Sequence, residues 1–183
     1  MAFIQALKRI IKDEWLEPTT FLRESGQTKC KWVQLQFKGQ RAIFRHPHPS
    51  GSGNISFEFF KDVTHLKKMC DSIVFLDENA NNIVYILCCE LKSDNYGVSL
   101  AQFKAADLLA KFIFDSAKRL CSQSDPLCGY INNLKVEIRF VRFTSKPDKP
   151  TVKSGKCKYY NEGPLLVRDE YCETNYSVQD FCC

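Results

Sequence analysis

Residues 70–102 read CDSIVFLDENANNIVYILCCELKSDNYGVSLAQ. The stretch holds two apolar runs, 71–78 and 82–92, with a polar segment between them that is rich in turn-forming residues. Runs of this length, separated by a turn, predict two strands that pair as an antiparallel hairpin. The last residues of the stretch, from Ser99, predict the start of a helix.

Charged residues stand at the open end of the predicted hairpin. Asp71 begins the first run and Glu90 ends the second, so antiparallel pairing brings both to one edge of the sheet. Side chains two apart in a strand share a face, which places Lys92 beside Glu90. These charges directly follow the apolar run IVYILCC, and burying them is costly unless they neutralise each other, bind a cation or reach the surface. The pattern therefore predicts two carboxylates and an ammonium at one point.

The flanking segments predict a helix, two strands, and a further helix and strand around this hairpin. An amphipathic helix is expected over 2–16 and two short strands over 31–45. Residues 99–120 form the strongest helical pattern, and 135–144 alternate like a half-buried strand with a basic outer side. Residues 57–60 suggest one more strand. The expected apolar face of the 99–120 helix consists of Leu100, Phe103, Leu108, Leu109, Phe112, Ile113 and Ala117.

Length and composition favour a globular protein with a proper core. The chain has 183 residues, of which 44% are hydrophobic. We expect a domain over 1–145, followed over 146–183 by a basic linker and an irregular, cysteine-containing extension. No apolar run approaches the roughly 20 residues that a membrane span needs, and the N-terminus lacks a signal-peptide pattern, so a cytoplasmic protein without membrane contact is expected. The net charge of +5 permits nucleic-acid binding without requiring it.

The cysteines and histidines of the chain are a second group of candidate metal ligands. We expect most of the ten cysteines to be reduced thiols, with Cys88 and Cys89 acting as small hydrophobes inside a strand. The chain has no CxxC knuckle for zinc, and His46 and His48 stand in a Pro- and Gly-rich loop typical of exposed histidines. The phosphate-loop, dinucleotide and serine-hydrolase motifs are absent from the sequence.

The motif at the hairpin resembles that of the PD-(D/E)XK nuclease superfamily, which has the restriction endonuclease-like fold. Asp71 is followed, after 18 intervening residues, by Glu90-Leu91-Lys92 and then by a helix that carries Gln102. The resemblance implies an α/β (α+β) protein with an αβββαβ core, in which a central mixed sheet is flanked by helices. The sequence departs from the pattern in having no proline before Asp71.

The same resemblance implies roles for individual residues. Asp71, Glu90 and the backbone carbonyl of Leu91 would hold Mg²⁺ or Mn²⁺, and Lys92 would orient or activate water. Gln102 would support them, and Glu14 of the first helix would be a further catalytic residue. Such a site suits phosphodiester hydrolysis, because a metal held by oxygen ligands neutralises charge on the phosphate and supplies a nucleophile from water.

We therefore expect a metal-dependent endonuclease that acts on DNA rather than RNA, with a role in defence against foreign nucleic acid by analogy with the fold. Control by a regulatory protein partner or by homodimerisation is expected, because an unrestrained nuclease would be toxic. The alternative is a catalytically inactive module of the same fold that binds nucleic acid or protein. That module would use a basic face formed by Lys104, Lys111, Arg139 and Arg142, and Glu90 and Lys92 would then be only an ion pair at a strand end.

Overall fold

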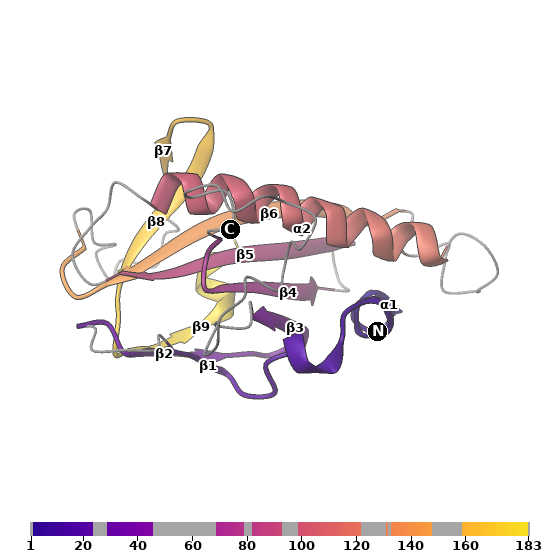
Figure 1. The fold of residues 1–183 in the computed structure, drawn as a ribbon, viewed down its shortest axis with the longest axis horizontal. Coiled ribbons are helices and arrows are strands. Elements are labelled where there is room, and N and C mark those ends of the chain that lie inside the picture. The colour runs from indigo at the N-terminus through magenta and orange to yellow at the C-terminus, as the bar shows by residue number, and fades with distance from the viewer. Residues whose placement is uncertain are drawn as a thin grey trace, which may run out of the picture.

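The computed structural model of the protein is a mixed α/β fold. Its described residues form two helices and two mixed sheets, arranged as three layers: helices, a large sheet and a small sheet (Figure 1). The structure describes residues 2–23, 29–45, 69–78, 82–92, 99–121, 131, 133–147 and 159–182. No helix in these ranges is long and apolar enough to cross a membrane.

A six-stranded sheet is the middle layer, with the strand order β3-β4-β5-β6-β8-β7. The first three strands are antiparallel neighbours, whereas β5, β6 and β8 run parallel to one another. The predicted strand over 57–60 lies outside the described residues. The strands of this sheet are β3 (Gln40–Arg45), β4 (Ser72–Glu78), β5 (Ile83–Lys92), β6 (Lys135–Thr144), β7 (Tyr160–Glu162) and β8 (Leu165–Tyr171).

The predicted hairpin is confirmed. Strands β4 and β5 pair antiparallel from Glu78 opposite Ile83 to Ser72 opposite Cys89. Continuing this register by one residue puts Asp71 opposite Glu90. The strands pair because both are apolar along their length, and β5 is buried on both faces as its sequence predicts. The hairpin thus delivers two acids to one sheet edge.

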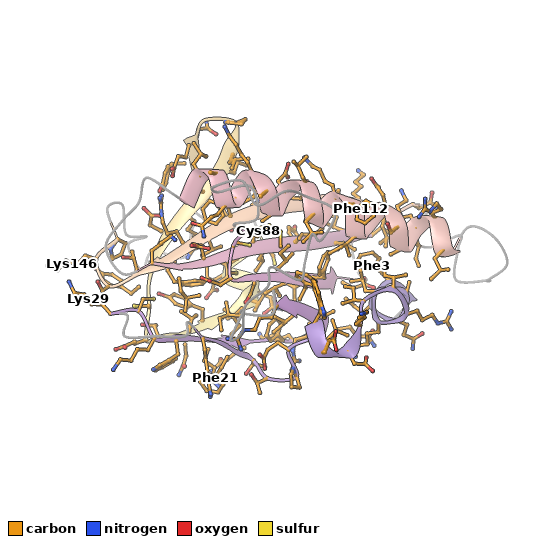
Figure 2. All side chains as sticks on the ribbon, viewed as in Figure 1. Phe3, Phe21, Lys29, Cys88, Phe112 and Lys146 are labelled. Atoms are coloured by element: carbon orange, nitrogen blue, oxygen red, sulfur yellow. The ribbon has the colours of Figure 1, made fainter. Side chains whose placement is uncertain are left out.

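Two helices cover one face of the large sheet. They are α1 (Ala2–Ile10) and α2 (Ser99–Cys121). Helix α2 is the crossover that the parallel pair β5 and β6 requires, and it packs with α1 over a core that includes Cys88 of β5 (Figure 2). Helix α2 begins soon after β5 ends, so its first turn is close in the chain to the end of β5 that carries Glu90.

The first helix is shorter than its sequence predicts. The pattern favours a helix over 2–16, but α1 ends at Ile10 and a 3-10 turn, η1 (Asp13–Trp15), follows. Leu16 then bridges to Phe44, and the N–H of Glu17 donates a hydrogen bond to the carbonyl of Ile43, at 2.8 Å. The helix ends early because the chain turns to pair with the edge of β3.

Helix α2 has two apolar faces rather than one broad face. Leu108 and Phe112, expected to face the core, are 70% and 67% exposed. The prediction that they pack on the sheet is therefore wrong. Phe103, Ile113 and Ala117 lie in the core as predicted. Ala106, Ala110 and Phe114, which were not expected there, complete the face that meets the sheet.

A small sheet, not a helix, covers the other face of the large sheet. Its strands are β1 (Phe21–Arg23), β2 (Trp32–Gln36) and β9 (Asn175–Ser177), in the order β1-β2-β9. A second apolar core fills the space between the two sheets. The expectation of a sheet flanked by helices therefore holds for one face only.

Residues 159–182 form three strands and a turn, although their sequence suggests an irregular tail. Strands β7 and β8 extend the large sheet, β9 joins the small one, and a final 3-10 turn, η4 (Val178–Phe181), buries Val178 and Phe181 in the core between the sheets. A separate domain over 1–145 stays a prediction, but strands from both sides of that boundary share both sheets.

Strand β6 also differs from its prediction. Val136, expected to point inward, is 37% exposed, whereas Phe140 and the four residues after it are all buried. The simple alternation fails because the second half of β6 lies between β5 and β8. Arg142, predicted as part of an outer basic face, is only 3% exposed.

Candidate functional site

Asp71 is fixed at the end of the hairpin by the backbone of the facing strand. Its Oδ2 atom accepts a hydrogen bond from the N–H of Leu91, at 2.6 Å. Leu91 stands between Glu90 and Lys92, so this bond holds the Asp71 carboxylate against the Glu-x-Lys segment. The donor is a backbone N–H group, which has no side-chain rotamer that could change. Hydrogen bonds to a charged carboxylate are also stronger than those between two neutral groups. Asp71 is therefore positioned before any ligand arrives.

Glu90 is a buried carboxylate with incomplete compensation. Its residue is 1% exposed, its Oε1 atom lies 2.5 Å from Nζ of Lys92, and its Oε2 atom has no hydrogen-bond partner among the described residues. Burial and then the charge of Asp71 raise the pKa of Glu90 to about 8, although Lys92 and the side-chain amide of Gln102 lower it. Without a further positive charge, Glu90 therefore tends to hold a proton at neutral pH.

Gln102 lies in the first turn of α2 and reaches the same region. Its Nε2 atom donates a hydrogen bond to the backbone carbonyl of Met69, at 3.2 Å, two residues before Asp71. Its Oε1 atom is buried and, like Oε2 of Glu90, has no partner in the described part of the chain. Buried oxygens without partners are uncommon, since most buried polar atoms are hydrogen-bonded. Two of them therefore mark this site.

Glu14 is not brought to the site. It stands in η1 with a side chain that is 69% exposed. Its contacts are an ion pair with Lys12 at 3.9 Å and a hydrogen bond donated by Nε1 of Trp15 at 3.1 Å. The structure thus groups Asp71, Glu90, Lys92 and Gln102, and it leaves Glu14 at the surface because the first helix ends four residues before it.

The site offers few protein ligands to a metal. Within the described ranges, no three His, Cys, Asp or Glu side chains gather closely enough to hold an ion. The oxygen donors that this segment could offer are the carboxylates of Asp71 and Glu90 and the carbonyl of Leu91. Mg²⁺ suits such a set, because it is commonly bound through one or two carboxylates and keeps several waters.

The other proposed metal ligands gain no support. His46 and His48 lie outside the described residues. The six cysteines whose side chains the structure describes are free, and five of them are buried, as expected for Cys88 and Cys89. Burial raises the pKa of Cys70 and Cys89 well above the usual range, which keeps these thiols protonated and unsuited to metal binding or nucleophilic attack.

Sequence reasoning missed a polar network that continues from the site along the sheet. Arg142 of β6 is in register with Glu90 of β5, and its Nε donates to Oδ1 of Asp169, at 2.8 Å. Its Nη2 donates to the hydroxyl of Tyr160 and to Glu162, each at 2.7 Å. The hydroxyl of Tyr160 in turn donates to Oδ2 of Asp169, at 2.8 Å. Arg142 is thus neutralised inside the protein.

The network changes the electrostatics expected for β6. Burial by itself would lower the pKa of Arg142, but the hydrogen bond and charge of Asp169 raise it, so the guanidinium stays charged. The predicted basic face therefore loses Arg142, and Arg139 is paired with Glu137 at 2.8 Å. The signal in the sequence was the run Arg168-Asp169-Glu170 directly after apolar residues, which is unusual for a surface segment.

No family model, curated protein or solved structure matches this chain.

Proposed function

We propose that this protein is a metal-dependent nuclease with a restriction endonuclease-like core, acting on DNA rather than RNA. The order of elements supports the fold: α1, the antiparallel strands β3, β4 and β5, the crossover helix α2 and the parallel strand β6 follow one another as in an αβββαβ core. The arrangement of the hairpin supports the activity, since Asp71 stands opposite Glu90 and Lys92 follows on the same strand.

The observation that carries the proposal is the unpartnered Oε2 of Glu90 beside a second carboxylate. Two acids in one poorly solvated place repel each other, and Lys92 contacts only Oε1 of Glu90. A divalent cation would compensate both charges and use the free oxygen. The residues present fit Mg²⁺ or Mn²⁺, with Asp71, Glu90 and the carbonyl of Leu91 as oxygen ligands.

The residues around the carboxylates suit phosphodiester hydrolysis. A bound divalent ion would supply a Lewis acid and lower the pKa of a bound water. Lys92 is 21% exposed, so its ammonium can meet both Glu90 and a solvent-side substrate, where it would hold water and stabilise charge on a phosphate. The carbonyl oxygen of Gln102 can accept a hydrogen bond from that water. Asp71, tied to the backbone of Leu91, keeps its position throughout.

The test is cleavage of plasmid DNA, single-stranded DNA and RNA by the purified full chain in Mg²⁺ or Mn²⁺, with and without EDTA. We expect metal-dependent cleavage of DNA, reduced at least about 100-fold in Glu90→Gln and in Lys92→Met. Glu137→Gln is the matched control, because that acid lies on β6, is 43% exposed and pairs with Arg139. Full activity in both site variants would remove the assignment, and cleavage confined to RNA would replace DNA as the substrate.

One observation favours the inactive module as a second candidate. Lys92 already pairs with Glu90, and Asp71 already has the N–H of Leu91, which are contacts that can simply stabilise a strand end. This candidate predicts DNA binding that weakens with salt, ignores EDTA and is not accompanied by cleavage. A defence role and control by a protein partner or by homodimerisation remain expectations that follow from the nuclease proposal. The cytoplasmic location remains an expectation from the sequence.

A further inference from the structure

The outer face of α2 carries a second apolar stripe that faces away from the sheet. Leu108, Phe112 and Leu120 are 70%, 67% and 50% exposed. Ala101 and Arg119, also on this side, are exposed, and Ala105 and Ser116 are partly so. Helices of soluble proteins normally keep one apolar face for the core, so a stripe along the opposite face needs another explanation.

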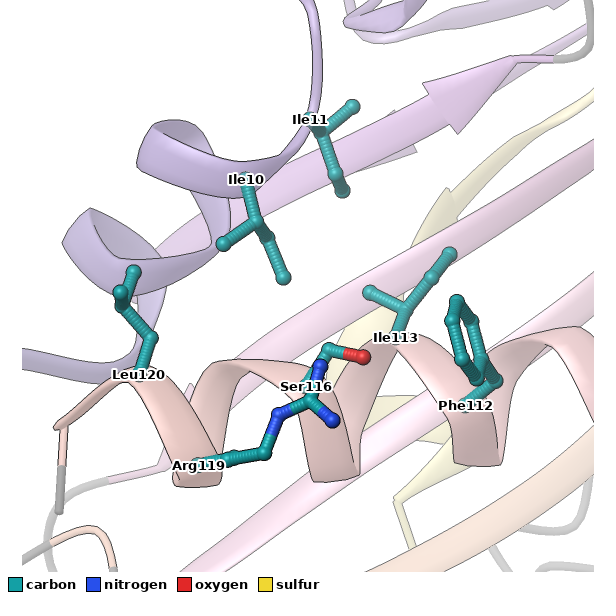
Figure 3. A pocket seen from close by; sticks show the side chains of 7 residues that line it. All are labelled: Ile10, Ile11, Phe112, Ile113, Ser116, Arg119 and Leu120. Carbon is teal, nitrogen blue, oxygen red and sulfur yellow. The ribbon is translucent and has the colours of Figure 1, made fainter.

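A pocket of about 430 Å³ adjoins the stripe, between α1 and α2. Ile10 at the end of α1 and Ile11 directly after it approach the pocket from one side, and Phe112, Ser116 and Leu120 of α2 from the other (Figure 3). Its walls are mostly apolar, with Arg119 at the border. It offers space for a large apolar side chain beside the ring of Phe112.

The exposed apolar area is about half of what one partner in a dimer contributes. The four large side chains, Ile10, Leu108, Phe112 and Leu120, expose roughly 400 Å² in total. That value lies within the range of the largest patches on monomers, and a standard interface buries about 800 Å² per partner. The neighbouring alanines and charged residues of α2 can supply the remainder.

The stripe is complementary to itself when two copies of α2 run antiparallel. Its small residues, Ala101 and Ala105, are at the N-terminal end, and its large ones, Arg119 and Leu120, at the C-terminal end. With a two-fold axis near Phe112, Ala105 of one copy faces Arg119 of the other, and Leu108 faces Ser116. The smaller Ala105 and Ser116 thus leave room for Arg119 and Leu108, while the two Phe112 rings meet at the axis.

One oppositely charged pair follows the same symmetry. Lys111 and Asp115 lie on one flank of the stripe, four residues apart, and both are exposed. Antiparallel pairing brings Lys111 of each copy next to Asp115 of the other, which gives two symmetric opposite-charge contacts. Lys111 lies 2.6 Å from Asp107 in its own chain, and a second acid from the other copy would add to that pair.

We propose that this face binds a second copy of the chain, with two α2 helices antiparallel and Phe112 of each copy inserted between α1 and α2 of the other. The interface is isologous and closed, so it yields a dimer and not a filament. The proposal does not depend on the nuclease activity, because the stripe shares no residue with the carboxylate site.

Sedimentation equilibrium of the full chain over micromolar to millimolar concentrations tests the proposal. The expected result is a monomer–dimer equilibrium with a dimer of twice 21.1 kDa. Phe112→Asp should weaken dimerisation at least about tenfold, because it puts a charge at the centre of the interface. Leu166→Asp is the control, since Leu166 is 40% exposed on β8, outside the stripe, and this variant should dimerise like the wild type.

A charge reversal separates the proposed register from other modes of association. Asp115→Lys should weaken the dimer by placing two lysines together, and Lys111→Asp with Asp115→Lys should restore it. The double variant keeps an opposite-charge pair between positions 111 and 115 but loses the pair of Lys111 with Asp107, at a small cost in helix stability, so circular dichroism must verify that it is folded. A chain that stays monomeric at millimolar concentration, or a dimer that tolerates both Phe112→Asp and Asp115→Lys, overturns the proposal.

Discussion

Asp71 and Leu91 are joined by a hydrogen bond of 2.6 Å, from the N–H of Leu91 to the carboxylate of Asp71, at the open end of the β4 and β5 hairpin. The same bond that closes the hairpin holds the Asp71 charge next to Glu90. The proximity of the two carboxylates is therefore a consequence of strand register. It contributes, after burial, to the raised pKa of Glu90.

The first prediction concerns the pH dependence of stability. The pKa of Glu90 is about 8 in the folded chain and near 4.5 when unfolded, so between these values the folded state holds a proton that the unfolded state has lost. The contribution of Glu90 to the free energy of unfolding should then fall as pH rises, by at most ~1.4 kcal/mol per pH unit. Urea unfolding in EDTA at pH 5, 6.5 and 8 measures this slope.

Glu90→Gln should remove that slope, because a glutamine does not titrate. The variant should therefore gain stability relative to the wild type as pH rises from 5 to 8. Glu137→Gln, which changes an exposed carboxylate, should keep the wild-type slope. Parallel pH profiles for the wild type and Glu90→Gln would contradict the raised pKa.

The second prediction concerns divalent metal. Binding of Mg²⁺ or Mn²⁺ should raise the melting temperature of the wild type, since a ligand that binds only the folded state stabilises it. Glu90 must lose its proton to bind the ion, so affinity should increase with pH up to about 8, by at most ~10-fold per unit. Isothermal titration calorimetry at pH 6.5 and 8 measures the change.

Variants at the two carboxylates distinguish this site from surface binding. Asp71→Asn and Glu90→Gln should each abolish the metal-induced stabilisation, whereas Glu137→Gln should retain it. An equal shift in all three variants would place the ion elsewhere.

The third prediction concerns the buried pair of Arg142 and Asp169, which are 3% and 1% exposed. Arg142→Met leaves the Asp169 carboxylate buried with only the Tyr160 hydroxyl, so it should destabilise the protein by about 3–5 kcal/mol. Arg142→Met with Asp169→Leu removes both charges and should recover much of that loss. Urea unfolding of both singles and the double completes the cycle, and additive losses would show that the pair is not coupled.

The hairpin and α2 could be predicted from sequence because their signals are local. The β4 and β5 runs are continuous and apolar, and the turn between them fixes which ends meet, so the meeting of Asp71 and Glu90 follows from spacing alone. The helical period of 99–120 is equally local. It does not reveal which of two apolar faces meets the sheet, and Leu108 and Phe112 were therefore assigned to the wrong face.

The parts that sequence did not predict depend on distant partners. Strand β8 is buried because it pairs with β6, more than twenty residues earlier, and its charges are satisfied there by Arg142 and within the strand by Arg168. Sequence patterns predict that charged residues lie at the surface. The charged residues of β8 were therefore predicted to belong to an irregular acidic tail, although the strand is buried. The prediction that Glu14 belongs to the site was wrong for a similar reason, because the chain leaves α1 to reach the edge of β3.

The last prediction tests whether 146–183 is a separable extension. Phe181, in η4, is fully buried, with its ring 6.1 Å from that of Phe143 and 5.6 Å from that of Tyr176. The guanidinium of Arg168 lies over the same ring at 4.7 Å. Phe181→Ala should destabilise the protein by about 3–5 kcal/mol, because it opens a cavity between the two sheets.

Leu166→Ala serves as the control for Phe181→Ala, since that leucine belongs to the same segment but is 40% exposed, and it should cost well under 1 kcal/mol. Both losses are measured by urea unfolding of the full chain, followed by circular dichroism. If Phe181→Ala shows a single unfolding transition, shifted as a whole to lower urea concentration, the C-terminal strands and the hairpin fold together. The reason is that the cavity lies in the core between the two sheets, to which β5 and β6 contribute. A small loss confined to a separate early transition would support a domain that ends near residue 145.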